Sequence, residues 1–227
     1  MSKHFTVGTF EFLAELSRNN DREWFQENKD KYEAKVIAPA ISFLEELEKP
    51  LRKVAPMLQI DAKPHGGSIM RIYRDTRFSK DKTPYKTNLG MSLRHQADAD
   101  IHAPGGYIHI APQECFVGVG CWHPPRKELA AIRKAIDANP KAWTKAVDGR
   151  RFAEVFELGG ESLKTAPRDY GKDHPQIEHL KRKDFIGLAT MKRSEVLGTD
   201  LVEQTIDLFK RAKPMMSFLC DAVGIPY

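Results

Sequence analysis

Positive charge is concentrated in one short run of the sequence, residues 71–86. The run holds six lysine and arginine side chains and two carboxylates, a net charge of +4, whereas residues 1–70 sum to −1. Crowded cations repel one another, and a bound anion relieves that repulsion; the planar fork of arginine suits phosphate and carboxylate. We therefore interpret this run, called the cationic loop below, as an anion-binding site. Its cations are Arg71, Arg74, Arg77, Lys80, Lys82 and Lys86.

The same run admits a simpler interpretation, which is an exposed network of ion pairs. Asp75 and Asp81 lie within it and can pair with neighbouring arginines, although exposed pairs of this kind add little stability. In the ligand-binding interpretation the two aspartates orient the arginines, and tyrosines form the walls and offer hydroxyl groups. These tyrosines are Tyr73, Tyr85 and Tyr107. The residues leave both interpretations open.

Alternation along the neighbouring segments adds candidates. Successive side chains of a strand point to opposite faces, so Tyr107 and His109 share a face opposite Ile108. Applied to the other expected strands, the same rule places polar side chains and glycines on one face of the sheet. The glycines leave room for a ligand, and this mixture is expected of a pocket. The alternative is a sheet covered by helices, with these groups as satisfied buried polar side chains. The expected face comprises Arg71, Tyr73, Arg94, Tyr107, His109 and Trp122, with Gly90, Gly118 and Gly120.

The leading functional hypothesis is the binding of an anionic, phosphate-bearing small molecule by the cationic loop, with Arg94 among the binding residues. A second hypothesis is an enzyme acting on such a ligand, with Asp75 or His109 as general base and the arginines stabilising negative charge. A third is nucleic-acid binding, which needs cations along a groove and exposed aromatic side chains. A fourth is a purely structural protein whose loop is internal bracing.

A ligand-rich loop follows the expected second strand and is a weak candidate for a divalent metal. Carboxylate and imidazole groups this close could coordinate such an ion. A solvated polar loop is the simpler account, so the sequence assigns no metal and no cofactor. The residues concerned are His95, Asp98, Asp100 and His102.

Composition favours a water-soluble globular protein with one domain, residues 1–227. The chain is 41% apolar and 30% charged, which argues against disorder. No apolar run approaches the roughly 20 residues that span a bilayer, and the N-terminus lacks the pattern of a secretory signal. Three cysteines without metal or disulfide spacing favour a reducing compartment, so we expect a cytoplasmic protein without a membrane partner. Nothing indicates the oligomeric state.

The N-terminal and C-terminal parts of the chain show the apolar periodicity of helices. Thr9 is expected to cap a first helix, Asn20 and Glu23 to form a capping box for the next, and Pro39 to begin another. After Pro124-Pro125 helical spacing returns, and Thr199 is expected to cap a long final helix that is bent or broken near Pro214. These helices flank a central region with a different period.

That central region alternates apolar and polar residues in the manner of strands. The expected strands are 68–74, 89–95, 106–111 and 114–122, with a fifth at 185–190. Pro112 and Gln113 join two of them as a short hairpin. Sequential strands with short links predict an antiparallel meander. The predicted fold class is α+β, with an antiparallel sheet of about five strands flanked by N-terminal and C-terminal helices.

Two long motifs carry a resemblance to a known family. They are Asn19-Asn20-x-Arg22-Glu23-Trp24-Phe25 and Arg71-x-Tyr73-Arg74-Asp75-x-Arg77-Phe78-Ser79-x-Asp81-Lys82-x-Pro84-Tyr85-Lys86, with Pro104-Gly105-Gly106-Tyr107 as a further match. Over nearly its whole length the chain resembles the uncharacterised family catalogued as domain of unknown function 2461. The resemblance implies a single-domain protein of bacterial type and supplies no activity. The family pattern often has a second tyrosine where this chain has Ile108.

Overall fold

The computed structural model describes residues 4–97 and 103–227 of the chain. Its strands are β1 (Leu58–Gln59), β2 (Leu89–His95), β3 (Gly105–Ile110), β4 (Cys115–Cys121), β5 (Glu157–Gly159) and β6 (Phe185–Met191). The N-terminal helices are α1 (Val7–Arg18), α2 (Arg22–Glu27), α3 (Lys29–Tyr32), a π-helical turn (Glu33–Ile37) and α4 (Ala38–Val54). The later helices are α5 (Arg126–Ala138), α6 (Pro140–Val147), α7 (Arg150–Ala153), α8 (Ile177–Leu180), α9 (Arg193–Val196) and α10 (Leu201–Val223).

The strands form one antiparallel sheet in the order β1-β2-β3-β4-β6-β5. The expected meander of β2, β3 and β4 is present, and β6 joins it beside β4. The α+β class with helices at both ends of the chain is therefore confirmed. The sheet has six strands rather than about five. The sequence did not predict β1 and β5, which are only two and three residues long.

The expected strand at 68–74 does not form, and the chain makes only isolated bridges there. Ile69 bridges Met91 of β2, whereas Tyr73 bridges Tyr85 further along the chain. Residues 68–70 hydrogen-bond with β2, but the Lys86 amide then donates to the Ile72 carbonyl at 2.7 Å. The segment thus changes partner halfway, and neither ladder grows long enough to make a strand.

Apolar side chains of the strands fill one face of the sheet and pack against helices. Met91, Ile108 and Val117 are partners across β2, β3 and β4 and are at most 2% exposed. Helix α10 packs on β4 and on α4, and a Cβ at Gly106 would lie 2.6 Å from the Phe209 ring of α10. This close approach brings the helical layer down onto the sheet.

Two helix starts differ from the expected ones by a few residues. Helix α1 begins after Thr6 rather than Thr9. The Thr9 hydroxyl accepts the Thr6 amide at 3.3 Å and donates to the Lys35 carbonyl at 2.7 Å. Helix α10 is preceded by Asp200 rather than Thr199 and continues through Pro214. Pro214 lies on the exposed side of the helix, where water can satisfy the carbonyl that loses its partner. Within the described ranges no helix is long and apolar enough to cross a membrane.

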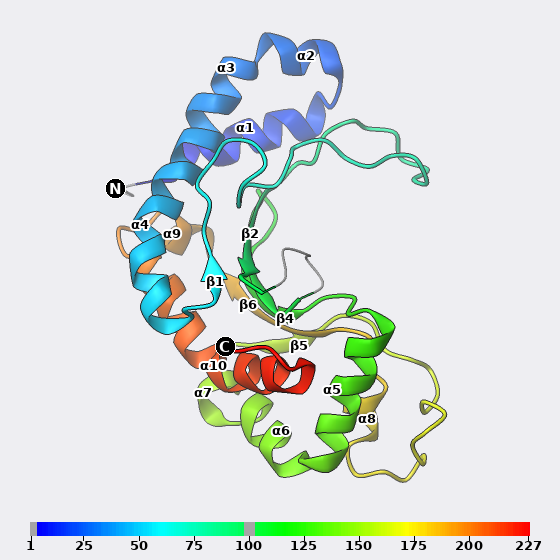
Figure 1. Cartoon of the computed structure of the whole chain (residues 1–227). Helices are drawn as coiled ribbons and strands as arrows, with labels where there is room; N and C mark the ends of the chain where they lie inside the picture. Colours follow the sequence, from blue (N-terminus) through cyan, green and yellow to red (C-terminus); the bar gives the residue numbers. More distant parts are fainter. Residues whose placement is uncertain (1–3, 98–102) are drawn as a thin grey trace.

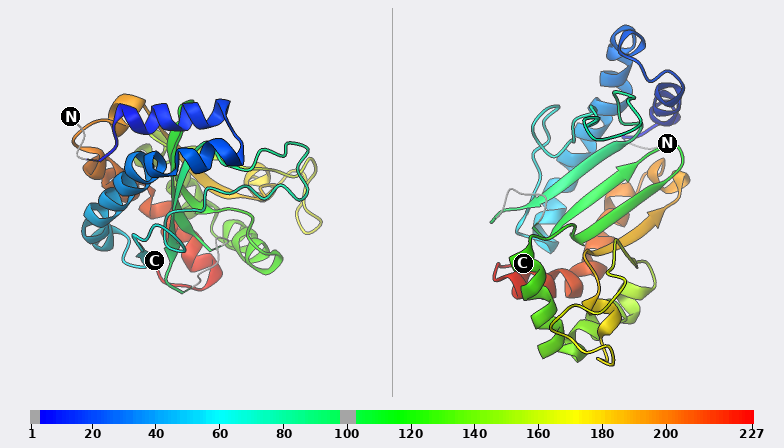
Figure 2. Two further views of the ribbon diagram at one scale, coloured as in Figure 1. Left: turned by 90° about the horizontal axis from the view of Figure 1, so that it is seen from above. Right: turned by 90° about the vertical axis from the view of Figure 1, so that its right-hand side faces the viewer.

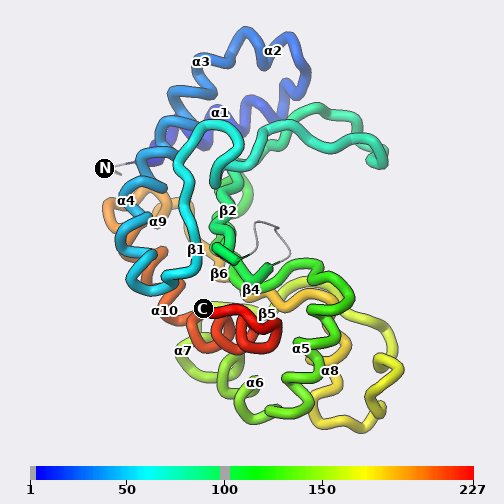
Figure 3. Tube along the Cα trace, in the orientation of Figure 1, coloured from blue at the N-terminus to red at the C-terminus, as the bar shows by residue number. Residues whose placement is uncertain are grey.

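The other face of the sheet is open. In Figure 1 helices α1, α2 and α3 lie above the sheet, α4 lies to its left, and α5, α6 and α8 lie below it, while the cationic loop projects to the right. The tube in Figure 3 follows this loop out from the body and back to β2. The right-hand view of Figure 2 looks directly onto the strands, with α4 and α10 behind them. Helices therefore border this face without covering it.

Candidate functional site

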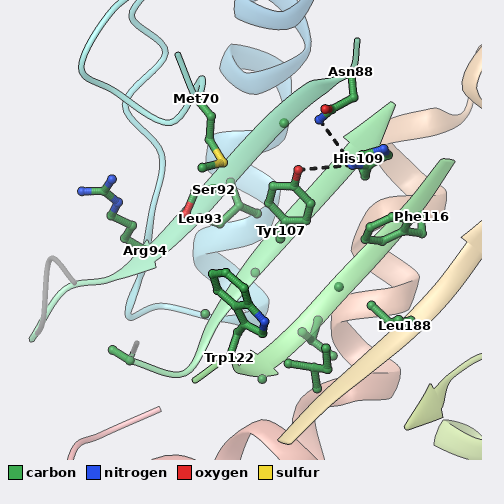
Figure 4. Close-up of a pocket in the computed structure, with 18 of the residues that line it drawn as sticks. Met70, Asn88, Ser92, Leu93, Arg94, Tyr107, His109, Phe116, Trp122 and Leu188 are labelled. Atoms are coloured by element: carbon green, nitrogen blue, oxygen red, sulfur yellow. Dashed lines mark hydrogen bonds between the residues drawn. The ribbon is translucent and has the colours of Figure 1, made fainter. Parts of the chain in front are cut away.

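The open face of the sheet carries a cavity of about 690 Å³, called the sheet-face cavity below. This volume lies within the range of small-molecule pockets. Glycines form much of its floor, and the side chains around it come from β2, β3, β4 and β6 (Figure 4). The lining includes Met70, Arg74, Lys86, Asn88, Gly90, Ser92, Arg94, Gly105, Tyr107, His109, Phe116, Gly118, Gly120, Trp122, Ile186 and Leu188.

Strand register explains why the face is hollow. Tyr107 on β3 lies between Ser92 of β2 and Gly118 of β4, and His109 lies opposite Gly90. A Cβ at Gly90 would be 2.6 Å from the Tyr107 hydroxyl oxygen, whereas a Cβ at Gly118 would meet nothing closer than 3.5 Å. Gly90 therefore makes room for the tyrosine, and Gly118 leaves room for a Cβ in ordinary van der Waals contact with Leu188 and Tyr107.

Tyr107 and His109 form a hydrogen-bonded pair inside the cavity. The Tyr107 hydroxyl lies 3.2 Å from Nδ1 of His109, and Nδ2 of Asn88 lies 3.4 Å from the same nitrogen (Figure 4). A nitrogen that accepts from these donors carries no proton, which places the imidazole proton on Nε2. Nε2 faces Oε1 of Glu114 at 3.7 Å. The imidazole also stacks on Phe116, with ring centroids 4.6 Å apart.

Burial keeps both groups of this pair neutral near pH 7. It lowers the pKa of His109 from its usual 6.5, and the nearby Glu114 carboxylate opposes the shift. It also raises the pKa of Tyr107, against the hydrogen bond with Asn88. His109 can therefore take the Tyr107 proton at Nδ1 while the Tyr107 oxygen takes a proton from a ligand, a relay that lets the imidazole act as a general base.

Lys86 is the cation that burial affects most clearly at the cavity. Its side chain is partly buried, and its pKa is lowered first by burial and then by the charge of Arg71. In the part of the chain that the structure describes, no carboxylate pairs with this ammonium group. Lys86 therefore has no ion-pair partner among the described residues at a mostly apolar cavity, since Asp75, the carboxylate that also lines it, is bound to Arg77.

Trp122 forms another part of the wall, and a turn after β4 positions it. The backbone amide of His123 donates to the buried Asp184 carboxylate at 2.7 Å, and the His123 residue adopts a positive φ of 48°. Asp184 is 1% exposed and also accepts the amide of Glu161. This carboxylate holds the end of β4, so the Trp122 side chain lies at the cavity with 48% of its surface exposed.

The cationic loop is partly neutralised by its own aspartates. Arg77 pairs with Asp75 through two hydrogen bonds of 3.0 and 2.7 Å, and Arg74 pairs with Asp81 and the Thr83 hydroxyl. The ion-pair interpretation therefore describes Arg74 and Arg77. The Arg77 guanidinium carbon lies 5.7 Å from the centroid of the Phe78 ring, which is 94% exposed.

The predicted binding residues separate into three groups. Arg74, Lys86, Arg94 and Tyr107 line the sheet-face cavity together with His109. Tyr73 and Lys82, with Arg74 again, line a second hollow beside α2. Arg71, Arg77 and Lys80 line neither hollow. Tyr85, which was expected to form a wall, is 1% exposed and stacks on Phe25 at 4.2 Å, so it belongs to the core.

Two further candidates fit their proposed roles poorly. Asp75 is exposed, and its hydrogen bonds with Arg77 lower its pKa to about 2, which makes it a weak base. His95 is buried, with Nε2 2.7 Å from the Pro226 carbonyl and Nδ1 accepting the Ala97 amide. Asp98, Asp100 and His102 lie outside the described residues. Among residues 4–97 and 103–227, no three potential ligands are grouped to hold a metal ion.

Sequence reasoning missed Asn20 as a structural anchor of the loop. It was expected to cap α2, but Asp21 does so by accepting the Trp24 amide at 2.9 Å. The Asn20 side chain instead donates to the Tyr85 carbonyl at 2.9 Å and accepts the Tyr85 amide at 3.0 Å. Sequence reasoning also missed Ile186 and Leu188, which alternation along β6 could have placed on the open face.

Comparison with known proteins gives one match. A family model described as a conserved hypothetical protein (DUF2461) matches residues 8–218. No curated protein and no solved structure matches the chain. The match spans the N-terminal helices, the cationic loop and the whole sheet.

Proposed function

Because the chain belongs to the DUF2461 family of conserved hypothetical proteins, whose description names no reaction, we propose a function from the site itself. The protein binds a small amphipathic anion in the sheet-face cavity. The apolar body of the ligand lies over the glycine floor, and its negative charge lies beside Lys86. This proposal keeps the anionic ligand expected from the sequence but moves its site from the cationic loop to the sheet.

The observation that carries the proposal is the Lys86 ammonium, which pairs with no carboxylate in residues 4–97 and 103–227 and lies at the edge of an apolar cavity. A cation that loses water without gaining a partner is unfavourable, and the lowered pKa of Lys86 reflects this cost. An anion bound beside it would restore the missing partner. The nearby Arg71, which contributes to the lowered pKa, adds to the positive field at the same place.

The walls indicate the rest of the ligand. Phe116, Leu188 and Trp122 offer aromatic and aliphatic surface, and Gly118 and Gly120 of β4 add no side chain to the lining. A flat ring system can lie against such a surface and stack on an aromatic side chain. The polar end of the cavity, with Asn88, Tyr107 and His109, supplies hydrogen bonds that orient the ligand.

A fluorescent probe with this chemistry tests the proposal. Anilinonaphthalene sulfonate combines flat apolar rings with one negative charge, and its emission rises when it leaves water. We expect saturable binding to the wild type and at least about tenfold weaker binding to Gly118→Val, since the new side chain enters the cavity. Valine suits a strand and a Cβ at this position meets no close atom, so the variant should fold. Equal binding by both proteins would contradict the proposal.

The Tyr107–His109 hydrogen bond favours a second candidate, an enzyme acting on the same ligand. His109 would serve as general base in place of Asp75, and Lys86 would stabilise developing negative charge. Nitrophenyl acetate and nitrophenyl phosphate are suitable chromogenic probes. Turnover by the wild type that is lost in His109→Asn would support catalysis, whereas equal rates in both proteins would remove His109 as the base.

The location is also a proposal. We place the protein in the cytoplasm on its cysteine usage: the three cysteines are buried and form no disulfide among the described residues, as is usual in a reducing compartment.

A further inference from the structure

A second hollow lies on the other side of the cationic loop, where the loop meets the start of α2. Its volume is about 530 Å³, and it is called the loop recess below. Arg22 lines it from α2, while Tyr73, Arg74, Thr76 and Lys82 line it from the cationic loop. Two segments separated by about fifty residues in the sequence therefore meet around one polar space.

The recess is held in shape by contacts that its lining residues Asn20 and Tyr73 make with Tyr85. Asn20 exchanges two hydrogen bonds with the backbone of Tyr85, at 2.9 and 3.0 Å, which ties the turn before α2 to the loop. The Tyr85 ring stacks on Phe25 of α2 at 4.2 Å, and Tyr73 packs against Tyr85 at 5.4 Å. The recess is thus preorganised, which limits the entropy lost when a ligand binds.

The lining has an excess of positive charge. Arg22, Arg74 and Lys82 face Asp21 alone among the lining carboxylates, and Asp81 pairs with Arg74 from outside the lining, so a net charge of about +1 remains. Asp21 is already engaged in capping α2 through the Trp24 amide. Arg74 uses a single terminal nitrogen, Nη1, for Asp81 and Thr83, and Lys82 donates to the neutral Thr76 carbonyl at 2.9 Å.

The residues that line the loop recess also offer hydrogen-bond donors. Within the described ranges Arg22 has no hydrogen bond or ion pair to a carboxylate, so its guanidinium donors remain available. Thr76 and Thr83 add hydroxyl groups, and Tyr73 is 51% exposed, so its ring and hydroxyl are accessible beside them. Convergent guanidinium, ammonium and hydroxyl donors are the chemistry that recognises a phosphoryl group.

We propose that the loop recess binds the phosphoryl dianion of a small phosphate ester or of pyrophosphate. This site is distinct from the sheet-face cavity and does not depend on the ligand proposed there, although Arg74 lines both hollows. The recess favours a highly charged anion, because Arg22 and Lys82 pair with no carboxylate among the described residues. It assigns a role to Arg22, which lies outside the cationic loop.

Calorimetric titration of pyrophosphate into the full chain, at low ionic strength and about pH 7.5, tests the proposal, because screening weakens exposed charges. We expect saturable binding to one site. Arg22→Gln and Lys82→Gln should each weaken it by about tenfold or more, since each removes a direct donor. Lys80→Gln is the matched control: it removes the same charge from the same loop at a residue that lines neither hollow, and should change affinity by less than about twofold.

Several outcomes would overturn the proposal. One is the absence of saturable pyrophosphate binding up to millimolar concentration. Another is an equal loss of pyrophosphate affinity in Lys80→Gln and Lys82→Gln, which would mean that the overall charge of the loop attracts the anion and no defined site binds it. Binding of a single-stranded oligonucleotide but not of pyrophosphate would assign the surface to nucleic acid. Lys86→Gln should leave pyrophosphate binding unchanged, so failure here is separable from failure of the sheet-face proposal. Arg22→Lys, which keeps the charge, should recover part of the affinity.

Discussion

The Tyr107 hydroxyl occupies the space that a side chain at position 90 would need, because a Cβ there would lie 2.6 Å from its oxygen. Gly90 and Tyr107 belong to adjacent strands, with Gly90 opposite His109 and Ser92 opposite Tyr107. The glycine lets the tyrosine lean across β2, where its hydroxyl meets Nδ1 of His109 at 3.2 Å. The polar end of the sheet-face cavity thus depends on a missing side chain.

Gly90→Ala should therefore displace the Tyr107 hydroxyl. We expect a loss of about 1–3 kcal/mol in the free energy of unfolding, as for other overpacked sites. Urea denaturation measures it. In a Tyr107→Phe background the cost should fall by about 1 kcal/mol, because the closest atom is gone while ring carbons at 3.1–3.2 Å remain. Equal costs in the two backgrounds would show that the hydroxyl is not what Gly90 accommodates.

Asn20→Ala should destabilise the junction between α2 and the cationic loop. Two hydrogen bonds to the Tyr85 backbone are lost, and the expected cost in unfolding free energy is about 1–3 kcal/mol. Hydrogen exchange at the Tyr85 amide should accelerate with it. Asn19→Ala is the matched control, since the Asn19 side chain donates only to the Glu15 carbonyl at an exposed helix end. A similar effect of both variants would contradict the anchoring role of Asn20.

His109 should make stability depend on pH in the weakly acidic range. Its pKa is below 6.5 in the folded protein, so the unfolded state binds the proton more readily. The contribution is therefore fully present above pH 6.5 and is lost as pH falls through the folded pKa. His109→Asn should reduce this loss in urea titrations, whereas the exposed His65→Asn should not.

The difference between variant and wild type is the readout, because burial also lowers the pKa of His179. Glu114→Gln adds an independent check by NMR titration of the His109 ring. The Glu114 carboxylate raises the His109 pKa, so its removal should lower that pKa further. An unchanged or higher His109 pKa in Glu114→Gln would contradict the electrostatic account of the pair.

Lys86 should titrate below the ordinary lysine pKa of 10.5. NMR of methyl-labelled lysines can follow each ammonium group separately. Arg71→Gln should raise the Lys86 pKa, since the Arg71 charge contributes to its lowering, and a bound anion should raise it as well. A Lys86 pKa at or above 10.5 in the free wild type would remove the observation on which the sheet-face proposal depends.

Much of the fold was predictable because apolar residues recur along the sequence with the period of a helix or a strand. The alternation along β2, β3 and β4, with Pro112 and Gln113 between two of them, predicted the meander and the shared face of Tyr107 and His109. The edge strands β1 and β5 were not predictable, since two or three residues show no period. Residues 68–74 alternate like a strand, but a change of partner that no local pattern reveals keeps them irregular.

The candidate site was predictable in its charge and not in its geometry. The density of cations in residues 71–86 pointed to an anion, but only the path of the loop decides which cation faces a cavity. Lys86 lies at the sheet, whereas Lys80, six residues earlier, lines neither hollow. Asn20 likewise resembled a helix cap by its local context, and its bonds to Tyr85, 65 residues away, appear only in the folded chain.

The central claim is that the sheet-face cavity binds an amphipathic anion with its charge at Lys86. The most direct measurement compares anilinonaphthalene sulfonate with N-phenylnaphthylamine, which has the same rings and no charge, on wild type, Lys86→Gln and Lys80→Gln. The account predicts that wild type and Lys80→Gln prefer the sulfonate by about tenfold, and that Lys86→Gln loses this preference while still binding the neutral probe. A preference that survives in Lys86→Gln, or that is absent from the wild type, would contradict the claim.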